Sequence, residues 1–412
     1  MQISMFDGSH RFVINKPIRL IELFAGIGSQ AKALKNLGVD FEHYRICEFD
    51  KYAVASYNAI HGTKFRRSDI TKITAIDLGI VDTYKYCYIL TYSFPCQDLS
   101  NAGKQAGMAK GSGTRSGLLW EVERLLDECQ ELPQVLVMEN VPQVIAQGNI
   151  EHFAKWIEKL EKLGYKNKWE ILNAKDFGIP QNRERCFMVS ILGDYYYDFP
   201  KTIPLTLRLK DMLGKEVDEK YYLSEETINR IQNWKAQQDP LKDIEKEKLI
   251  SPCSKARGAG EEHSGMVLIS EPIIVAETDN HAKGGIYDIN GIARTLLATE
   301  YKQPMQIVEN PICGLIQPLN RNYKADGEER QETIEWRNDN LSGALRTGVL
   351  PVVKQKLKIR KLTPKECWRL MGFSDQDIEK AKAVGMSDTQ LYKQAGNSIV
   401  VNVLMAIFEK MI

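Results

Sequence analysis

The sequence lacks long apolar segments, closely paired cysteines and an excess of charge of either sign. No run approaches the roughly 20 apolar residues that span a bilayer. The N-terminal stretch MQISMFDGSHRFVINK has no apolar core of the kind that signal peptides carry. We therefore expect neither secretion nor membrane insertion, and we expect the protein to be cytoplasmic.

The charge balance and the cysteine spacing narrow the kinds of site to expect. The formal net charge is +1, which gives no global sign of nucleic-acid binding, although a local basic cluster can still set the field of a cleft. The eight cysteines lie far apart and form no C-x-x-C pair, which argues against a zinc site of the usual spacing. We expect no metal, and free cysteines that mostly pack as small core residues.

The length and the order of apolar runs predict an α/β fold. The chain has 412 residues, of which 43% are hydrophobic and 26% charged, so a globular protein of two domains is expected. Up to about residue 192, apolar runs alternate with helical patterns. The runs predicted as strands are IRLIELFAG, FEHYRICEFD, KYCYILTYS, VLVMENV and RCFMVSIL. This alternation predicts a mostly parallel sheet with helices on both faces.

The pattern changes in the middle of the chain. Short strand-like runs such as GMVLIS, PIIVAE and VLPVV are separated by polar stretches that contain glycine and proline. This predicts a smaller, irregular, β-rich domain. We therefore divide the chain into residues 1–192, 193–355 and 356–412, with the last segment returning to the first domain.

Helical signals return near the C-terminus. Thr363 and Glu366 fit a capping box, and Pro364 takes the first helical position between them. A last helix from about Ser398 has a broad apolar stripe that must be buried. We expect this helix to pack beside the first strand, so that both ends of the chain build one cofactor domain.

A glycine turn after the first strand indicates a nucleoside-type cofactor. Gly26, Gly28 and Ala31 fit G-x-G-x-x-A between a strand and a helix, and Glu48 ends the next strand. Such glycines let the backbone approach a ligand, and the acid can accept hydrogen bonds from ribose hydroxyls. A tight turn without a ligand and an NAD-dependent dehydrogenase are the alternatives. The dehydrogenase would need a catalytic histidine or lysine, and it does not predict the Pro-Cys-Gln sequence that follows a later strand.

That Pro-Cys-Gln sequence places a thiol where a strand ends. Cys96 follows Phe94 and Pro95 at the carboxyl end of the predicted strand KYCYILTYS. A packed loop thiol is the usual reading of one such cysteine. A thiolate at this edge of a parallel sheet would, however, be well placed as a nucleophile.

Several motifs occur in one order along the chain: FAGIGS, FPCQDLSNAGKQAG, MENV, QNRERCF and QAGNS. With these motifs the chain resembles the DNA (cytosine-5)-methyltransferase family of bacterial and phage type, over residues 18–192 and 358–412. The resemblance implies a Rossmann-like, S-adenosylmethionine-dependent methyltransferase sheet. It also implies that the middle of the chain is a target-recognition domain.

The resemblance carries a set of site residues. It implies Cys96 as the nucleophile, Glu139 as the acid that holds the base, and Arg183 and Arg185 as the neighbouring cations. The implied S-adenosylmethionine contacts are Phe24, Ala25, Gly26, Ile27, Gly28, Glu48, Phe49, Asp69, Ile70, Pro95, Leu118, Asn397 and Ser398. The implied DNA contacts are Gln97, Ser100, Arg115, Gln181, Thr295, Leu296 and Arg346. Ser29 and Ser93 stand where the family commonly has glycine.

The implied activity is methyl transfer to C5 of a cytosine in a specific DNA sequence. Addition of the Cys96 thiolate to C6 would make C5 nucleophilic, and the base would have to be flipped out of the duplex. We expect double-stranded DNA as the partner, a monomer, and a possible restriction endonuclease that acts on the same site. A tRNA cytosine-5 methyltransferase and a catalytically silent DNA-binding relative are the alternatives. The large middle region argues against the first, and the intact set of Cys96, Glu139 and Arg185 against the second.

Overall fold

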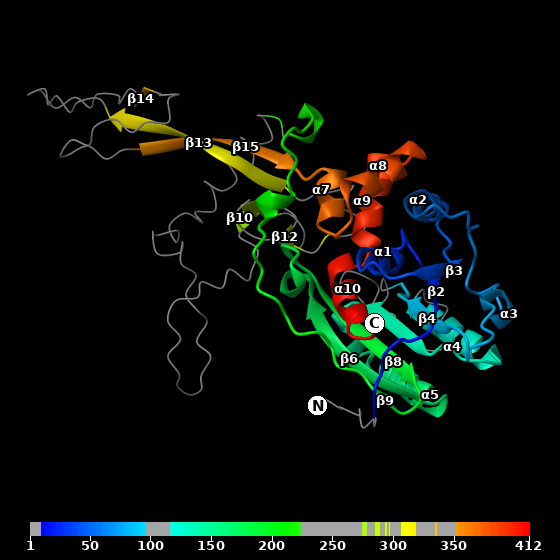
Figure 1. Cartoon of the computed structure of the whole chain (residues 1–412). Coiled ribbons are helices and arrows are strands. Elements are labelled where there is room, and N and C mark those ends of the chain that lie inside the picture. Colours follow the sequence, from blue (N-terminus) through cyan, green and yellow to red (C-terminus); the bar gives the residue numbers. More distant parts are fainter. Residues whose placement is uncertain are drawn as a thin grey trace, which may run out of the picture.

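A six-stranded sheet forms the centre of the molecule, in the strand order β3-β2-β4-β5-β8-β6 (Figure 1). The computed structural model describes residues 10–95, 116–222, 224 and 352–412, and in the span between them residues 274–277, 285–288, 293–294, 296, 306–318 and 334–335. The predicted α/β architecture is confirmed within these residues.

The strands are parallel except at one edge of the sheet. The parallel strands are β2 (Ile18–Leu23), β3 (Phe41–Cys47), β4 (Cys87–Tyr92) and β5 (Val135–Asn140). Next to β5 lies β8 (Glu184–Leu192), which is antiparallel both to β5 and to the edge strand β6 (Tyr165–Asn173). Every residue of β4 and β5 is buried, which is why their sequences are nearly all apolar.

Helices cover both faces of the sheet and bury two separate apolar clusters. One face carries α1 (Ser29–Asn36), α2 (Lys51–His61), α7 (Pro364–Arg369), α8 (Asp375–Ala383), α9 (Asp388–Asn397) and α10 (Val401–Glu409). The other face carries α3 (Ala75–Leu78), α4 (Leu119–Glu128) and α5 (Ile150–Lys162). Short 3-10 turns complete the layers: η1 (Ser116–Leu118), η2 (Pro142–Ile145) and η3 (Ala174–Phe177).

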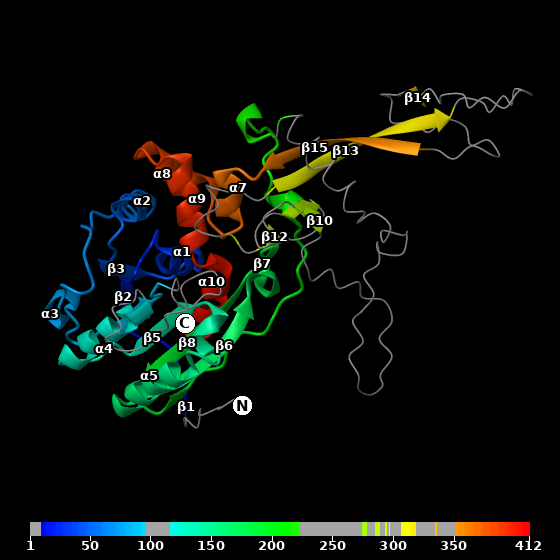
Figure 2. The same ribbon diagram turned by 180° about the vertical axis from the view of Figure 1, so that it is seen from behind.

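The C-terminal helices pack onto the N-terminal half of the chain. Helix α10 lies against α1, and the backbone N–H of Ile14 donates to the carbonyl oxygen of Met411 at 2.6 Å. Lys32 of α1 forms an ion pair of 2.7 Å with Asp377 of α8, both largely buried. The capping box predicted at Thr363 and Glu366 is present at the start of α7. The two ends of the chain therefore build one domain, as Figure 2 shows from behind.

Packed structure continues past the expected division at residue 192. Strand β9 (Tyr195–Tyr196) pairs with β1 (His10–Arg11), and the turns η4 (Leu209–Met212) and η5 (Glu219–Tyr221) follow. The side chains of Tyr197, Phe199, Leu209 and Met212 belong to the same buried cluster as α1 and α10. The domain that the two ends of the chain build thus includes this segment, because its apolar side chains complete the core.

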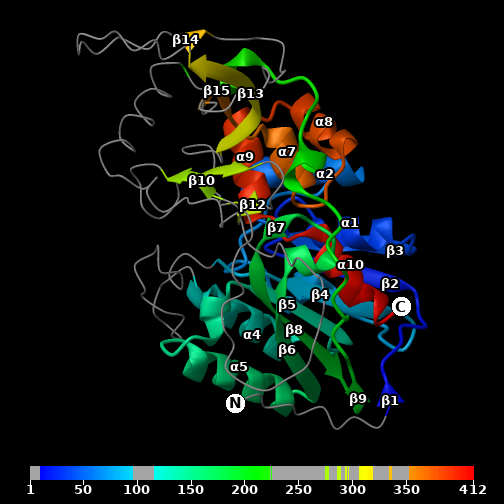
Figure 3. The ribbon, with the colours of Figure 1, turned by 90° about the vertical axis from the view of Figure 1, so that its left-hand side faces the viewer.

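The region after this segment is rich in β-structure where it is described. Strands β13 (Gln306–Pro318) and β15 (Val352–Lys361) form a long antiparallel pair, joined by β10 (Ile274–Glu277), β11 (Gly285–Asp288) and β14 (Ile334–Glu335). We call this group of strands the arm, and Figure 3 shows it above the sheet layer. At its base, fully buried Arg360 holds Glu366 of α7 through two contacts of 2.8 Å, so the arm starts from a fixed point.

Candidate active site

The turn between β2 and α1 holds two glycines, one packed against side chains and one facing open space. Both have positive φ, 56° at Gly26 and 81° at Gly28. A Cβ atom at Gly28 would lie 2.4 Å from Nε2 of His61 and 2.6 Å from Cε2 of Tyr57. At Gly26 a Cβ atom would meet no described atom within 4 Å. Gly28 is therefore needed for packing against α2, whereas Gly26 leaves open space on the outer side of the turn.

A buried polar cluster supports this turn from below. The carboxyl of Glu22, fully buried on β2, accepts hydrogen bonds from the Tyr57 hydroxyl and from the backbone N–H of Ala31. Burial raises the pKa of Glu22 to about 7. The His61 ring donates to the carbonyl oxygen of Ile27 at 3.0 Å, and burial lowers the pKa of His61 to about 3, so the ring is neutral.

Replacing Glu22 with glutamine is expected to remove a pH dependence of stability. The pKa of Glu22 is higher in the folded chain than in the unfolded chain, so the folded state holds an extra proton between about pH 4.5 and 7. Stability contributed by this group therefore falls as pH rises through that window, by roughly 3 kcal/mol at most. Thermal unfolding from pH 5 to 8 should show a smaller fall for E22Q than for the wild type. E42Q, at an exposed carboxyl of β3, is the control and should follow the wild type; identical curves for all three proteins would contradict the assignment.

Glu48 closes the turn from the end of β3. Its carboxyl accepts hydrogen bonds from the backbone N–H groups of Gly26 at 2.9 Å and Asp50 at 2.7 Å, and burial raises its pKa. Asp50 caps α2 through the N–H of Tyr52 and forms an ion pair of 2.7 Å with Lys393 of α9. The acid predicted from the cofactor pattern thus lies directly against the glycine turn.

Three further predicted cofactor contacts lie near Glu48. The ring of Phe49 is 63% exposed, and the guanidinium carbon of Arg67 lies 5.3 Å from its centroid. Asp69 accepts hydrogen bonds from the N–H and hydroxyl of Thr71, which lower the pKa of its carboxyl. The neighbouring side chain of Ile70 is buried. One face of the Phe49 ring therefore remains exposed, and hydrogen bonds fix the conformation of the loop at Asp69.

Arg124 of α4 holds the loop at Asp69 in place. Its guanidinium donates to the carbonyl oxygens of Ile70 at 3.0 Å and Ile73 at 2.9 Å. Glu121 and Glu128, on the same helix, fix the guanidinium at 2.8 Å each. Helix α4 has half-buried Leu118, another predicted cofactor contact, as its N-cap residue. One helix thus positions two parts of the predicted cofactor wall.

The loop that carries the predicted nucleophile leaves the sheet at the end of β4. Cys96 itself lies outside the described residues, and the description ends at half-buried Pro95. The side-chain amide of Asn140, at the end of the neighbouring strand β5, donates to the carbonyl oxygen of Phe94 at 3.0 Å. The hydroxyl of Ser93 is buried without a hydrogen-bond partner among the described residues, so a glycine there would lose no bond to these residues. Asn140 therefore fixes the backbone just before the cysteine.

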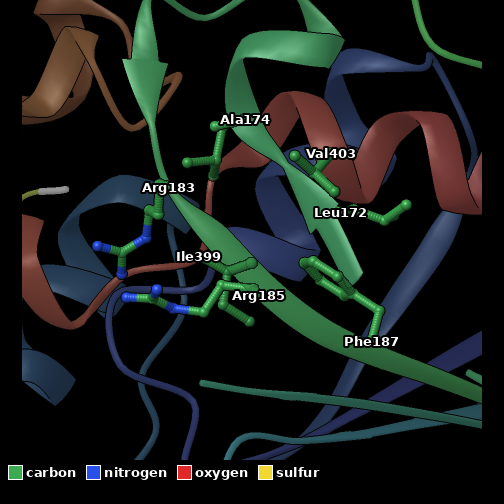
Figure 4. A pocket seen from close by; sticks show the side chains of 8 residues that line it. Leu172, Ala174, Arg183, Arg185, Phe187, Ile399 and Val403 are labelled. Atoms are coloured by element: carbon green, nitrogen blue, oxygen red, sulfur yellow. The ribbon is translucent and has the colours of Figure 1, made fainter. Parts of the chain in front are cut away.

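Glu139 and Arg185 form an ion pair next to this loop. Glu139 precedes Asn140 on β5 and is 8% exposed, and its Oε1 lies 3.2 Å from Nε of Arg185 on β8. The antiparallel register of β5 and β8 brings these strand ends together. In Figure 4 the guanidinium groups of Arg183, which directly precedes β8, and of Arg185 point to the same side. Apolar side chains of Leu172, Phe187, Ile399, Val400 and Val403 line the space behind the arginines.

Arg183, predicted to orient the neighbouring cation, has a different environment from Arg185. Arg183 is 4% exposed, and its guanidinium donates to three main-chain carbonyl oxygens, those of Leu296, Gly396 and Ser398. A guanidinium used in this way orients backbone segments instead of facing a base. The contacts of Arg183 are therefore with the main chain, and its place among the catalytic residues stays a prediction.

Gln181 and Leu296, both predicted as DNA contacts, lie in the interior. Both side chains are fully buried. The Gln181 amide donates to the carbonyl oxygen of Leu370 at 2.9 Å and accepts from the N–H of Leu296 at 3.4 Å. These side chains join segments of the chain, and contact with a duplex would require this packing to open.

The C-terminal motif returns to the glycine turn through α9. Asn397, exposed at the end of α9, and Ser398, buried, were both predicted as cofactor contacts. The Ser398 hydroxyl donates to the carbonyl oxygen of Gln394 at 2.7 Å. The Gln394 side chain accepts from Ser56 of α2 and donates to the carbonyl oxygen of Tyr52. This motif is thereby attached to the helix that follows Glu48.

Some predicted residues cannot be placed, and some functional residues were not predicted. Cys96, Gln97, Ser100, Arg115, Thr295 and Arg346 lie outside the described residues. Sequence patterns missed Arg124 and Gln394, because the carbonyl oxygens that they bind, those of Ile70, Ile73 and Tyr52, belong to the main chain of distant segments. Asn140 had a signal, since it follows Glu139 in MENV. In the part of the chain that is described, no group of His, Cys, Asp and Glu is arranged to hold a metal, and no helix is long and apolar enough to cross a membrane.

Comparison with known proteins gives one consistent result. The family profile described as C-5 cytosine-specific DNA methylase matches residues 18–412. The orphan methyltransferase M.SPBetaI of Bacillus phage SPbeta is 30% identical, over 96% of this chain and 97% of its own. The type II methyltransferase M2.ScrFI of Lactococcus lactis subsp. cremoris is also 30% identical, over 96% of this chain and 99% of its own. The crystal structure of the S. pombe Dnmt2 methyltransferase shares the fold, with a TM-score of 0.59 and 18% identity over 95% of this chain and 97% of that one.

Proposed function

Because the chain belongs to the C-5 cytosine-specific DNA methylase family and is a DNA cytosine-5 methyltransferase, we propose how its own residues carry out the reaction. The methyl donor is S-adenosylmethionine, the acceptor is C5 of a flipped-out cytosine in a specific sequence, and Cys96 is the nucleophile. The observation that carries this proposal is the Glu139–Arg185 pair. It lies beside the Phe94–Pro95 backbone that Asn140 fixes, directly before the cysteine.

The residues around the glycine turn fit a nucleoside cofactor. The open space at Gly26 leaves room for a ligand against the backbone, and the exposed ring of Phe49 offers a stacking surface. Glu48 accepts from ribose hydroxyls, Asp69 and Ile70 contact the adenine edge, and Leu118 completes the wall. Phe24, Ala25, Ile27, Gly28, Pro95, Asn397 and Ser398 complete the proposed set of cofactor contacts. When bound, S-adenosylmethionine supplies an electrophilic sulfonium methyl group.

Replacing Glu48 with alanine is expected to weaken binding of S-adenosylhomocysteine by about 10- to 150-fold. Hydrogen bonds to a charged acceptor contribute about 1.5–3 kcal/mol each, and the carboxylate is the acceptor here. Isothermal titration should show this loss for E48A and a smaller loss for E48Q, which keeps one acceptor oxygen. E42A, at an exposed position on the same strand, should bind like the wild type. Tight binding of NAD instead of S-adenosylhomocysteine would revive the dehydrogenase alternative.

The chemistry of the base requires a nucleophile of the kind that Cys96 provides. Cytosine C5 is a poor nucleophile, and bonding of a thiolate to C6 turns the ring into an enamine. C5 of this enamine can attack the sulfonium methyl group, with S-adenosylhomocysteine as the leaving group. Loss of the C5 proton to water then lets the C6–S bond break and releases Cys96 as thiolate. Pro95 restricts φ immediately before the cysteine, so the backbone that presents the thiol is stiff.

Glu139 and Arg185 are placed to stabilise the negative charge that develops on the base. Addition at C6 puts negative charge on N3 and O2 of the ring. Glu139 shares a proton with N3 and accepts from the exocyclic amine, while Arg185 donates to O2. The pair is largely buried, so these groups act in surroundings where water competes little.

Sequencing of 5-methylcytosine tests the proposed function. DNA from cells that lack their own cytosine-5 methylation and express this protein should carry the modified base at one recurring short sequence. A protein that folds and binds S-adenosylhomocysteine but leaves DNA unmethylated would instead be a silent relative. Methylation of tRNA alone in the same cells would favour the tRNA alternative.

The target-recognition role of residues 193–355 is likewise a proposal. It is supported by the β-rich arm and by the positions of the proposed catalytic and cofactor residues, which lie outside this span. Because the segment up to residue 222 packs in the catalytic core, we place the practical boundary after it. Exchange of residues 223–355 for those of another family member should move methylation to the donor's sequence while cofactor binding persists. A chimera with unchanged target sites would refute the division.

The substrate, the oligomeric state and a partner enzyme are proposed on the same grounds. Double-stranded DNA is the proposed substrate, and we propose that the protein acts as a cytoplasmic monomer. Relatives include both an orphan enzyme and a type II enzyme, so a restriction endonuclease that cuts the same sequence is a possible partner. Light scattering of the purified protein tests the monomer, and cleavage of unmethylated DNA by extracts of the native cells tests the endonuclease.

A further inference from the structure

Strand β12 (Ala293–Arg294) of the middle region is joined by main-chain pairing to the segment that directly precedes β8. It runs parallel to β7 (Gln181–Asn182), with Ala293 opposite Gln181 and Arg294 opposite Asn182. The N–H of Ala293 donates to the carbonyl oxygen of Pro180 at 2.7 Å, and the Ala293 side chain is fully buried. A short piece of the recognition region is therefore part of the interior, directly beside the arginine motif.

Arg183 connects this piece to the C-terminal cofactor motif. Its Nη1 donates to the carbonyl oxygen of Leu296 at 2.7 Å. Its Nη2 donates to the carbonyl oxygens of Gly396 at 3.0 Å and Ser398 at 2.8 Å. One planar group thus binds two segments to which different tasks are assigned, one reading DNA and one contacting the cofactor.

We propose that Arg183 couples cofactor binding to the target-recognition region, by holding the main chain at Leu296 and at Gly396–Ser398 in one fixed arrangement. The inference rests on the proposed function, because it takes Asn397 and Ser398 as cofactor contacts. When a ligand orders the backbone at residues 396–398, the guanidinium is restrained, and the carbonyl oxygen of Leu296 is restrained with it. The coupling is reciprocal, so ordering of the recognition region by DNA strengthens cofactor binding by the same factor.

The chemistry of arginine suits this task better than that of lysine. The guanidinium is planar, stays charged when buried, and presents several donors in a rigid fork. Its charge lies at the C-terminal end of α9, where the helix carbonyl groups favour a cation. Lysine keeps the charge but is a single flexible donor group, and so cannot hold carbonyl oxygens from two segments in the same geometry.

Hydrogen exchange followed by mass spectrometry tests the coupling without any knowledge of the target sequence. Peptides that cover residues 290–300 are compared with and without S-adenosylhomocysteine, in the wild type and in R183K. The matched control is R369K, because Arg369 also donates to two main-chain carbonyl oxygens, those of Met212 and Leu213, away from both coupled segments. In the wild type and in R369K, the ligand should slow exchange in these peptides about fivefold or more. In R183K the ligand should bind without this slowing.

A second variant keeps the test decisive if R183K does not fold. Q181M removes the side-chain bond to the N–H of Leu296 but leaves Arg183 in place, and should retain the ligand-dependent slowing. Loss of the slowing in Q181M would overturn the inference, because the coupling would then run through Gln181. Full slowing in R183K, or none in a wild-type protein that binds the ligand by isothermal titration, would overturn it as well. A wild-type protein that does not bind the ligand would contradict the proposed function instead.

Discussion

Replacement of Cys96 by serine is expected to abolish methyl transfer while binding of S-adenosylmethionine stays at the wild-type level. A serine hydroxyl is far less acidic than a thiol and is a poor nucleophile at neutral pH without a general base. The residues proposed to hold the cofactor are on other segments, chiefly the glycine turn, Glu48 and the loop at Asp69. The change therefore removes bond formation at C6 and leaves the cofactor wall intact.

Two measurements check this prediction. Incorporation of a tritiated methyl group into DNA should fall to the level of the enzyme-free control, while isothermal titration still shows cofactor binding. DNA with 5-fluorocytosine should form a denaturant-stable complex with the wild type, since fluorine at C5 leaves no proton to lose, and none with C96S. The nucleophile would have to be sought elsewhere if C96S transferred methyl groups at the wild-type rate.

The second large effect is expected at Glu139. Replacement by glutamine should lower kcat by about 10²- to 10⁴-fold, the usual contribution of a positioned general acid or base, with little change in KM for S-adenosylmethionine. An amide cannot exchange a proton with N3 of the ring. Steady-state kinetics provide the measurement, and E170Q is the control, because Glu170 is an exposed carboxyl on β6 and should keep the wild-type rate.

One other explanation of a slow E139Q enzyme can be separated. Loss of the carboxylate also leaves Arg185 without this ion-pair partner, which is costly for a buried charge. If that were the whole effect, the double variant E139Q/R185Q would recover activity. We expect the double variant to be no faster than E139Q, because both groups act on the base.

The strand and helix pattern was predictable because it depends on local periodicity. Runs such as those of β4 and β5 are mostly apolar, as is typical of strands buried on both faces. The capping box at Thr363 and Glu366 was predictable for the same reason, since its partners are three residues apart. The direction of β8 and the packing of the segment after residue 192 were not, because both depend on contacts between distant parts of the chain.

The residues of the candidate site likewise divide into those that a local sequence pattern predicts and those that it does not. Gly26, Gly28 and Glu48 follow a spacing that the sequence displays, and the structure brings them together. Arg183 and Arg185 have the same side chain and lie two residues apart, yet one donates to three carbonyl oxygens and the other pairs with Glu139. No local pattern distinguishes them, because the partners of Arg183 come from the middle and the end of the chain. Arg124 escaped prediction for the same reason, since it binds the backbone of a distant loop.

The way the recognition region is attached bears on how its specificity can evolve. Arg183 binds the main-chain oxygen of Leu296, and β12 pairs with β7 through backbone groups. The main-chain bonds themselves do not depend on which side chain occupies the position, although the buried side chains of Ala293 and Leu296 must still fit the core. The Arg360–Glu366 pair at the base of the arm does depend on its side chains, because a change in either partner leaves the other buried without this ion pair. If the arm carries out the proposed target recognition, a lineage can acquire a new target sequence by drift or recombination within the arm while the Arg360–Glu366 pair is inherited together.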